Sequence, residues 1–188
     1  MLASLFSMEY KQMNTSENFG TIRNGILLTV SNKRKGGIHM IKLRGHHLFC
    51  LLGYRGVGYS EEYAATMTAV HEALRNKPDT LIQVVKGPDH LCAKFPDDQP
   101  YHCEETGIYV RDKEILKRLG LTYSDVLPWR EVERRIRLQV KPDDIAVICE
   151  TCSWREYGVC EEGVQRTIEA KGLLPLGADP SVNARLLK

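Results

Sequence analysis

The sequence has no long apolar run that could cross a membrane. The run "NGILLTV" is far shorter than the roughly 18 apolar residues that a membrane helix needs. The opening stretch "MLASLFSMEYKQMN" has no basic lead, and Glu9 interrupts its apolar residues, so it does not predict a secretory signal. We therefore expect a cytoplasmic protein that has no membrane among its partners.

The sequence also lacks an excess of one charge. It carries 26 Lys and Arg residues against 24 Asp and Glu residues. Five basic and two acidic residues fall in 1–39, which leaves 21 basic and 22 acidic residues for the rest of the chain. Because the main body is nearly neutral, it has no basic face of the kind that binds nucleic acid, and we expect none among its partners.

Familiar catalytic motifs are missing as well. The chain has no glycine-rich nucleotide-binding motif and no Ser/His/Asp arrangement of a recognisable type. The sequence therefore leaves open whether the protein is an enzyme, and it identifies no catalytic residue.

The first 39 residues differ in composition from the remainder. They are rich in Asn, Ser, Thr and Lys, contain no cysteine and show no regular hydrophobic period. They end in "KRKGGIHM", where the codons for Lys-Gly-Gly can form a ribosome-binding site just before Met40. We expect 1–39 to be a disordered tail or a spurious extension, 40–176 to be a single cysteine-rich domain, and 177–188 to be a C-terminal tail.

Capping residues and apolar spacing predict mostly helices. Gly45 and Gly53 bound one helical stretch, and Ser60 can cap a second helix over 61–76. The stretch 80–87, "TLIQVVKG", has the β-branched residues of a strand. Residues 87–107 contain three prolines and predict an irregular loop.

The second half of the chain is expected to add four helices. A short strand at the start of 108–121 should run into a helix capped by Asp112, and Ser124 should cap a helix over 125–140. One more helix should carry Cys149 and Cys152, and a last one should begin at Cys160. The predicted fold class is α+β: a mostly helical single domain with a small β element and a cysteine-bearing irregular loop.

Three of the six cysteines lie within "CETCSWREYGVC". Cys149 and Cys152 form a C-x2-C pair, in which a tight turn at a helix end can point both sulfurs at one centre. Cys160 begins the next helix, whose dipole is expected to lower the pKa of the thiol and favour metal binding. These three cysteines are the predicted core ligands of a metal centre.

The remaining ligands of such a centre must come from distant segments. Cys92 and Cys103 in the irregular loop are candidate metal ligands, and Cys50 is either a cofactor-binding residue or part of the core. Five or six candidates exceed the four ligands of a zinc ion, which favours an iron–sulfur cluster of the 4Fe–4S type over zinc. Ordinary buried thiols and a thiol–disulfide exchange centre remain open alternatives.

Two adjacent histidines precede Cys50. Neighbouring residues on a helix point about 100° apart, so His46 and His47 cannot both face one site. His47 lies three residues before Cys50, so these two side chains could share a face and bind a cofactor together. A capping or core histidine would give the same pattern.

These motifs together resemble the bacterial and archaeal domain of unknown function 1284 family. The resemblance covers about residues 40–174 and rests on "MIKLRGHHLFCLLGYRGVGYS", the loop cysteines and "C-x2-C-x-W-x2-Y-G-x-C". It implies a small cytosolic protein that is suspected of binding iron–sulfur and has no established reaction. The matching positions are Arg44, Gly45, His46, His47, Cys50, Gly53, Gly58, Tyr59, Ser60, Cys92, Cys103, Cys149, Cys152, Trp154 and Cys160. The family's middle loop often reads C-x2-C-P, whereas this chain has Phe95 at the second cysteine position, which leaves open whether Cys92 ligates.

From these observations we expect a metal-binding protein with an iron–sulfur cluster that transfers electrons or holds the helices together. Trp154 would shield the cluster from water, and electron transfer would require a redox protein as partner. Two alternatives stay open. One is a structural zinc protein that acts as an interaction module, and the other is a metal-free enzyme in which Cys50 and His47 form a nucleophile–base pair.

Overall fold

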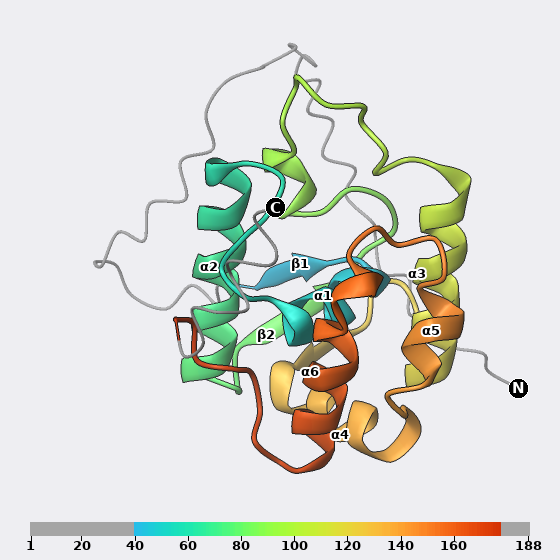
Figure 1. Ribbon diagram of the computed structural model, residues 1–188. Coiled ribbons are helices and arrows are strands. Elements are labelled where there is room, and N and C mark those ends of the chain that lie inside the picture. Colours follow the sequence, from blue (N-terminus) through green and yellow to red (C-terminus); the bar gives the residue numbers. More distant parts are fainter. Residues whose placement is uncertain (1–39, 178–188) are drawn as a thin grey trace, which may run out of the picture. The chain divides into compact units, whose positions relative to one another are not determined.

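The computed structural model describes residues 40–177, which form six α-helices, two 3-10 helices and a three-stranded sheet (Figure 1). This arrangement confirms the predicted α+β class, a mostly helical domain with a small β element. The expectations for 1–39 and for the tail beyond Gly177 lie outside the described residues. Within 40–177, no helix is both long enough and apolar enough to span a membrane.

The sheet consists of three short strands. They are β1 (Ile41–Leu43), β2 (Leu81–Val84) and β3 (Val126–Pro128). The central strand β2 pairs in parallel with β1 and antiparallel with β3. The strand predicted within 80–87 is confirmed as β2, whereas β1 and β3, with three residues each, are too short to show a period of two.

Helix α1 (Gly45–Gly53) occupies the bounds that its two glycines predict and is almost wholly buried. A Cβ atom at Gly45 would lie 2.5 Å from the backbone carbonyl oxygen of Asp112, on α3 (Thr106–Leu119). A Cβ atom at Gly53 would lie 2.7 Å from Sγ of Cys160, on α6 (Val159–Ile168). Both ends of α1 therefore approach another helix more closely than any side chain would allow.

The contact between α1 and α6 involves the backbone directly. A Cβ atom at Gly163 of α6 would lie 2.4 Å from the carbonyl oxygen of Leu52 in α1. Figure 1 shows α6, in orange-red, lying across α1. The buried Arg55 connects the same two helix ends, because its guanidinium donates hydrogen bonds to the carbonyl oxygens of Tyr54 and Val159 and pairs with Glu162 at 2.9 Å.

Helix α2 (Glu61–Asn76) confirms the prediction for 61–76. Its N-cap is Ser60, whose hydroxyl accepts a hydrogen bond from the backbone N–H of Tyr63 at 3.1 Å. Burial of an apolar core stabilises the packing of this helix with the rest of the domain. The largest apolar side chains that are less than 2% exposed are Trp129, Phe49, Leu43, Leu48, Leu51, Leu52, Leu74, Ile82, Leu91, Ile115 and Leu119.

The prediction for 108–121 is wrong in part, because no strand forms there and α3 begins at Thr106. Its buried residues recur at helical spacing, and this spacing outweighs the β-branched start of the segment. Asp112 is fully buried in the middle of α3 and does not cap it. Ser124 does not cap a helix either, since its positive φ of 75° lies far from the extended backbone of an N-cap.

The remaining elements follow Pro128. Helix α4 (Trp129–Gln139) is shorter than the predicted helix over 125–140, because β3 occupies the first residues of that range. Helix α5 (Asp144–Ile148) ends before Cys149, and α6 begins one residue before Cys160. The 3-10 helix η1 (Cys92–Lys94) lies in the loop that also carries Cys103. The 3-10 helix η2 (Arg155–Tyr157) lies between Cys152 and Cys160.

Candidate metal centre and the adjoining polar network

The six cysteines divide into two groups. Cys50, Cys149, Cys152 and Cys160 interact electrostatically with one another, and we call them the thiol quartet. Cys92 and Cys103 interact with each other, and we call them the thiol pair. All six are free thiols. The sequence predicted that Cys103 or Cys92, with Cys50 as a further candidate, would complete a centre with Cys149, Cys152 and Cys160. In the structure Cys50 and Cys103 both line one cavity with Cys152 and Cys160.

The quartet is assembled from three parts of the fold. Cys50 lies on α1, and Cys160 lies in the first turn of α6, next to Gly53 of α1. Cys149 is the C-cap of α5, and a turn follows in which the backbone N–H of Cys152 donates to the carbonyl oxygen of Cys149 at 2.9 Å. The close approach of α1 and α6 therefore sets the position of Cys50 relative to Cys160.

Burial and the neighbouring thiols oppose ionisation of three quartet residues, Cys50, Cys149 and Cys160. The pKa of Cys50 is raised well above its ordinary value by burial and then by the thiols of Cys160, Cys152 and Cys149. Burial raises the pKa of Cys149 to about 11. The expectation that the helix dipole lowers the pKa of Cys160 is wrong: burial, Cys149 and Cys152 raise it. A cation among these thiols would offset this effect and stabilise the thiolates.

Arg111 lies beside the quartet. Its side chain is 7% exposed, and its Nη2 donates a hydrogen bond to Oγ1 of Thr151 at 2.8 Å. Its Nε is buried without a hydrogen-bond partner. The positive charge of Arg111 lowers the pKa of Cys50 and Cys149 against the larger effect of burial. An anionic group bound by the quartet would satisfy this charge.

A cavity of about 100 Å³ separates the two groups of thiols. Three quartet residues line it together with Cys103, which belongs to the pair. Aromatic side chains close much of the remaining wall. The ring of Tyr59 stands perpendicular to that of Trp154 at a centroid distance of 5.9 Å, and Phe95 contacts Tyr59 at 5.0 Å. Trp154 thus borders the cavity, as its predicted shielding role requires.

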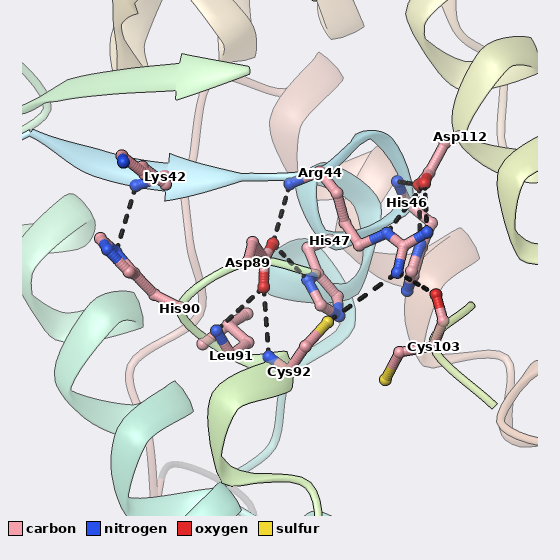
Figure 2. A network of polar contacts seen from close by, with 10 residues as sticks. All are labelled: Lys42, Arg44, His46, His47, Asp89, His90, Leu91, Cys92, Cys103 and Asp112. Carbon is pink, nitrogen blue, oxygen red and sulfur yellow. Dashed lines mark hydrogen bonds and ion pairs between the residues drawn. The ribbon is translucent and has the colours of Figure 1, made fainter. Parts of the chain in front are cut away.

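The thiol pair adjoins a network of buried charges (Figure 2). The carboxylate of Asp89 accepts four hydrogen bonds: from the backbone N–H groups of Arg44 at 2.8 Å, Leu91 at 2.9 Å and Cys92 at 3.2 Å, and from Nδ1 of His47 at 2.6 Å. Burial alone would raise the pKa of Asp89, but His47 and these donors outweigh it and hold that pKa far below its usual range. Asp89 is therefore an ionised carboxylate inside the domain.

Arg44 connects the network to α3 and to the thiol pair. Its fully buried guanidinium contacts Oδ2 of Asp112 through Nε at 2.8 Å and through Nη2 at 2.7 Å. Its Nη1 donates to the carbonyl oxygen of Cys103 at 2.6 Å and lies 3.9 Å from Sγ of Cys92. The other carboxylate oxygen of Asp112 accepts a hydrogen bond from the backbone N–H of His46 at 2.8 Å. Asp112 thus caps α1 from a neighbouring helix.

His47, Asp89 and Cys92 form a candidate metal site. One potential ligand atom from each of the three lies within 4.8 Å of the other two, and all three residues are buried. Burial opposes a charge on His47, but the Asp89 carboxylate outweighs it and raises the pKa of His47. His47 was expected to act with Cys50; the structure places its ring between Asp89 and Cys92 (Figure 2).

The two thiols of the pair differ in acidity. The Cys103 sulfur and burial together raise the pKa of Cys92. The Cys92 thiol, which can donate a hydrogen bond to the Cys103 sulfur, lowers the pKa of Cys103 against the effect of burial, and Tyr101 and Arg44 act in the same direction. Cys103 is therefore the thiol of the pair that ionises first.

Sequence reasoning missed Asp89, Arg111 and the true role of Asp112. Asp89 follows Pro88 and precedes a 3-10 turn, and these signals indicate only a local cap. Arg44 and Asp112 are separated by 68 residues, so their pairing leaves no local pattern. Arg111 lies on a helix rich in charged residues, where most arginines face solvent.

Fold and site together define a cysteine-rich α+β domain with a candidate metal site. The chain belongs to a family whose model is described as "Protein of unknown function (DUF1284)", which matches residues 58–158. This match confirms the resemblance inferred from the cysteine motifs. No curated protein and no solved structure matches the chain. Its function must therefore be argued from the site itself.

Proposed function

We propose that this protein holds an iron–sulfur cluster on the thiol quartet and serves as an electron carrier. The observation that carries this proposal is that Cys50, Cys152 and Cys160, from three separate parts of the fold, line one cavity, with Cys149 in the same turn as Cys152. Four cysteine thiolates are the usual ligands of such clusters. The fourth ligand here is Cys50, in place of the loop cysteines that the sequence favoured.

The spacing of the sulfurs supports a cluster over a single zinc ion. Sulfurs at about 2.3 Å from one tetrahedral zinc ion lie about 3.8 Å from each other. Within residues 40–177, the only set of three or more candidate ligands with all atoms within 4.8 Å of one another is His47, Asp89 and Cys92. No three of the quartet sulfurs all lie within 4.8 Å of one another, so in this structure they are not spaced for a single zinc ion.

The charges around the quartet support the same proposal. A cluster ligated by four thiolates is an anionic group, and Arg111 offers a buried positive charge with an unpartnered Nε. When bound, the cluster would supply one-electron transfer. Tyr59 and Trp154 line the adjoining cavity and would limit the access of water. A reducing compartment such as the cytoplasm and a redox protein as partner would fit this role.

Anaerobic purification of the full chain tests the assignment. We expect a brown protein that contains about four iron ions and four sulfides per chain. Cys149→Ser should abolish the colour and the bound iron. Cys92→Ser is the matched control: it also removes a buried thiol, but outside the quartet, and should keep both. Iron, acid-labile sulfide and zinc are quantified in parallel, together with the visible absorption spectrum.

The other outcomes are equally informative. A colourless protein with one zinc ion that is lost in Cys149→Ser would replace the cluster with a structural zinc site. Folded protein without metal would exclude a metal centre at the quartet. Iron that persists in Cys149→Ser but is lost in Cys92→Ser would place the centre at the pair instead.

A further inference from the structure

The thiol pair lies next to a histidine that is already oriented by a carboxylate. Nδ1 of His47 donates to Asp89 at 2.6 Å, which leaves Nε2 as the free nitrogen of the ring. Figure 2 shows the ring between the carboxylate and the Cys92 thiol. Carboxylate, imidazole and thiol in this order form the arrangement that activates a cysteine by general base catalysis.

Asp89 is poorly suited to bind a metal ion. Its two carboxylate oxygens already accept four hydrogen bonds. Three of these come from backbone N–H groups, each of which has only one hydrogen to donate. A metal ion would have to break at least one of these bonds inside the domain. The short distances within His47, Asp89 and Cys92 therefore reflect hydrogen bonding around an orienting carboxylate.

We propose that Cys92 and Cys103 form a redox-active dithiol that exchanges with disulfide substrates, and that His47, held by Asp89, accepts the proton of Cys92. Cys103 is 6% exposed and lines the cavity, so we assign it as the thiol that meets the substrate. Cys92 is 4% exposed and does not line the cavity. The Arg44 guanidinium, 3.9 Å from the Cys92 sulfur, favours the thiolate that must form there. The exchange does not require a bound cluster, but Cys103 lines the same cavity as three quartet residues.

The reaction balances in two steps. The Cys103 thiolate attacks one sulfur of the substrate disulfide; a mixed disulfide forms and the first substrate thiolate leaves. Cys92 gives its proton to Nε2 of His47 and attacks the Cys103 sulfur, which releases the second substrate thiolate. The protein dithiol is thereby oxidised to a disulfide, the substrate is reduced, and the two protein protons end on the two released thiols.

Glutathione disulfide is a suitable probe for the full chain under anaerobic conditions. After acid quenching and alkylation, trypsin should place Cys92 in the peptide 87–94 and Cys103 in the peptide 95–111, so a disulfide between them links two separate peptides. We expect this linked pair to form before any disulfide within the quartet. A pair that stays reduced, or a first disulfide elsewhere, would overturn the proposal.

The assigned order of attack is tested with Cys92→Ser and Cys103→Ser. In Cys92→Ser the glutathione adduct on Cys103 should accumulate, because the resolving thiol is absent. In Cys103→Ser the buried Cys92 should acquire little adduct. The reverse distribution would contradict the roles given to the two thiols.

The role of His47 is tested by the rate at which the adduct is resolved. His47→Gln should slow disulfide closure about 100-fold, as loss of a general base does, and the mixed disulfide on Cys103 should become visible by mass spectrometry. His90→Gln is the matched control, because His90 only accepts a hydrogen bond from the backbone of Lys42 at 3.2 Å. Equal rates in both variants would remove His47 from the mechanism.

A metal ion at the pair is the remaining outcome, and it can be recognised without His47→Gln. Metal that stays bound in Cys149→Ser and is lost on the further change Cys92→Ser would show that the pair ligates, and the dithiol proposal would fail. A colourless, cluster-free wild-type protein would refute the proposed function but would leave the dithiol unaffected.

Discussion

The thiol quartet and the thiol pair are both built around α1, yet their electrostatic surroundings differ. Around the pair, each buried charge has an opposite partner: Arg44 has Asp112 and His47 has Asp89. Around the quartet, burial and neighbouring thiols raise the pKa of Cys50 and Cys160, and the buried Arg111 donates its hydrogen bond to the neutral hydroxyl of Thr151. The buried charges near the pair are thus matched by opposite charges, whereas Arg111 near the quartet has a neutral partner.

The largest expected effect comes from breaking the charge balance on the side of the pair. Arg44→Met leaves Asp112 ionised and buried without its main partner, and we expect a loss of about 3–5 kcal/mol in the free energy of unfolding. Urea denaturation measures it. The quartet should still bind its metal in the folded fraction, because Arg44 does not contact it.

Arg134→Met provides the control for this change. Arg134 pairs with Glu131 at 2.6 Å, but its side chain is 54% exposed, so its removal should change stability far less than Arg44→Met does. If the two variants lost the same free energy of unfolding, the buried ion pair of Arg44 and Asp112 would not stabilise the fold as we expect.

A smaller effect is expected from separating the helices that assemble the quartet. A Cβ atom at Gly163 meets the carbonyl oxygen of Leu52 at 2.4 Å, so Gly163→Ala must push α6 away from α1. We expect a loss of about 1–3 kcal/mol and a lower metal content, because Cys160 moves relative to Cys50. Disulfide formation in the pair should be unchanged.

Gly107→Ala is the matched control for that prediction. Gly107 lies in the first turn of α3, and a Cβ atom there meets nothing within 4 Å. Alanine should therefore be neutral or stabilise by up to about 1 kcal/mol through helix propensity. Normal metal content in Gly163→Ala would show that the contact between α1 and α6 does not set the geometry of the quartet.

The effect that is smallest at neutral pH concerns His71, which belongs to neither group of thiols. Burial lowers its pKa to about 4 from an ordinary value of 6.5. Above pH 6.5 both folded and unfolded protein carry neutral His71; as the pH falls from 6.5 to about 4, only the unfolded state takes up the proton, so stability is lost. His71→Leu should flatten the stability curve in this window, as thermal unfolding at several pH values would reveal. An unchanged slope would contradict the assignment.

Local signals predicted much of the fold. Three features were predicted from local signals: the glycines at the ends of α1, the Ser60 cap of α2 and the β-branched residues of β2. Each of these signals affects only residues a few positions away in the chain. Ser124 and Asp112 both have side chains that can cap a helix. Ser124 instead lies in a turn with a positive φ, and Asp112 caps α1 rather than its own helix. Such choices depend on packing between distant segments, which a local pattern does not contain.

The candidate site was predictable by residue type but not by grouping. The C-x2-C pair and Cys160 were predicted to act together because their spacing is short, and this stays a prediction. The proposed use of Cys50 depends on the glycine contacts between α1 and α6, which no local pattern contains. The partnership of His47 with Asp89 spans 42 residues and has no sequence signature.

Anomalous X-ray diffraction from anaerobically grown crystals, recorded at the iron and zinc absorption edges, tests the central claim most directly. Iron density bonded to the sulfurs of Cys50, Cys149, Cys152 and Cys160 is the predicted result. Iron or zinc bound to Cys92 and His47, or a quartet whose four sulfurs bind no metal, would contradict it.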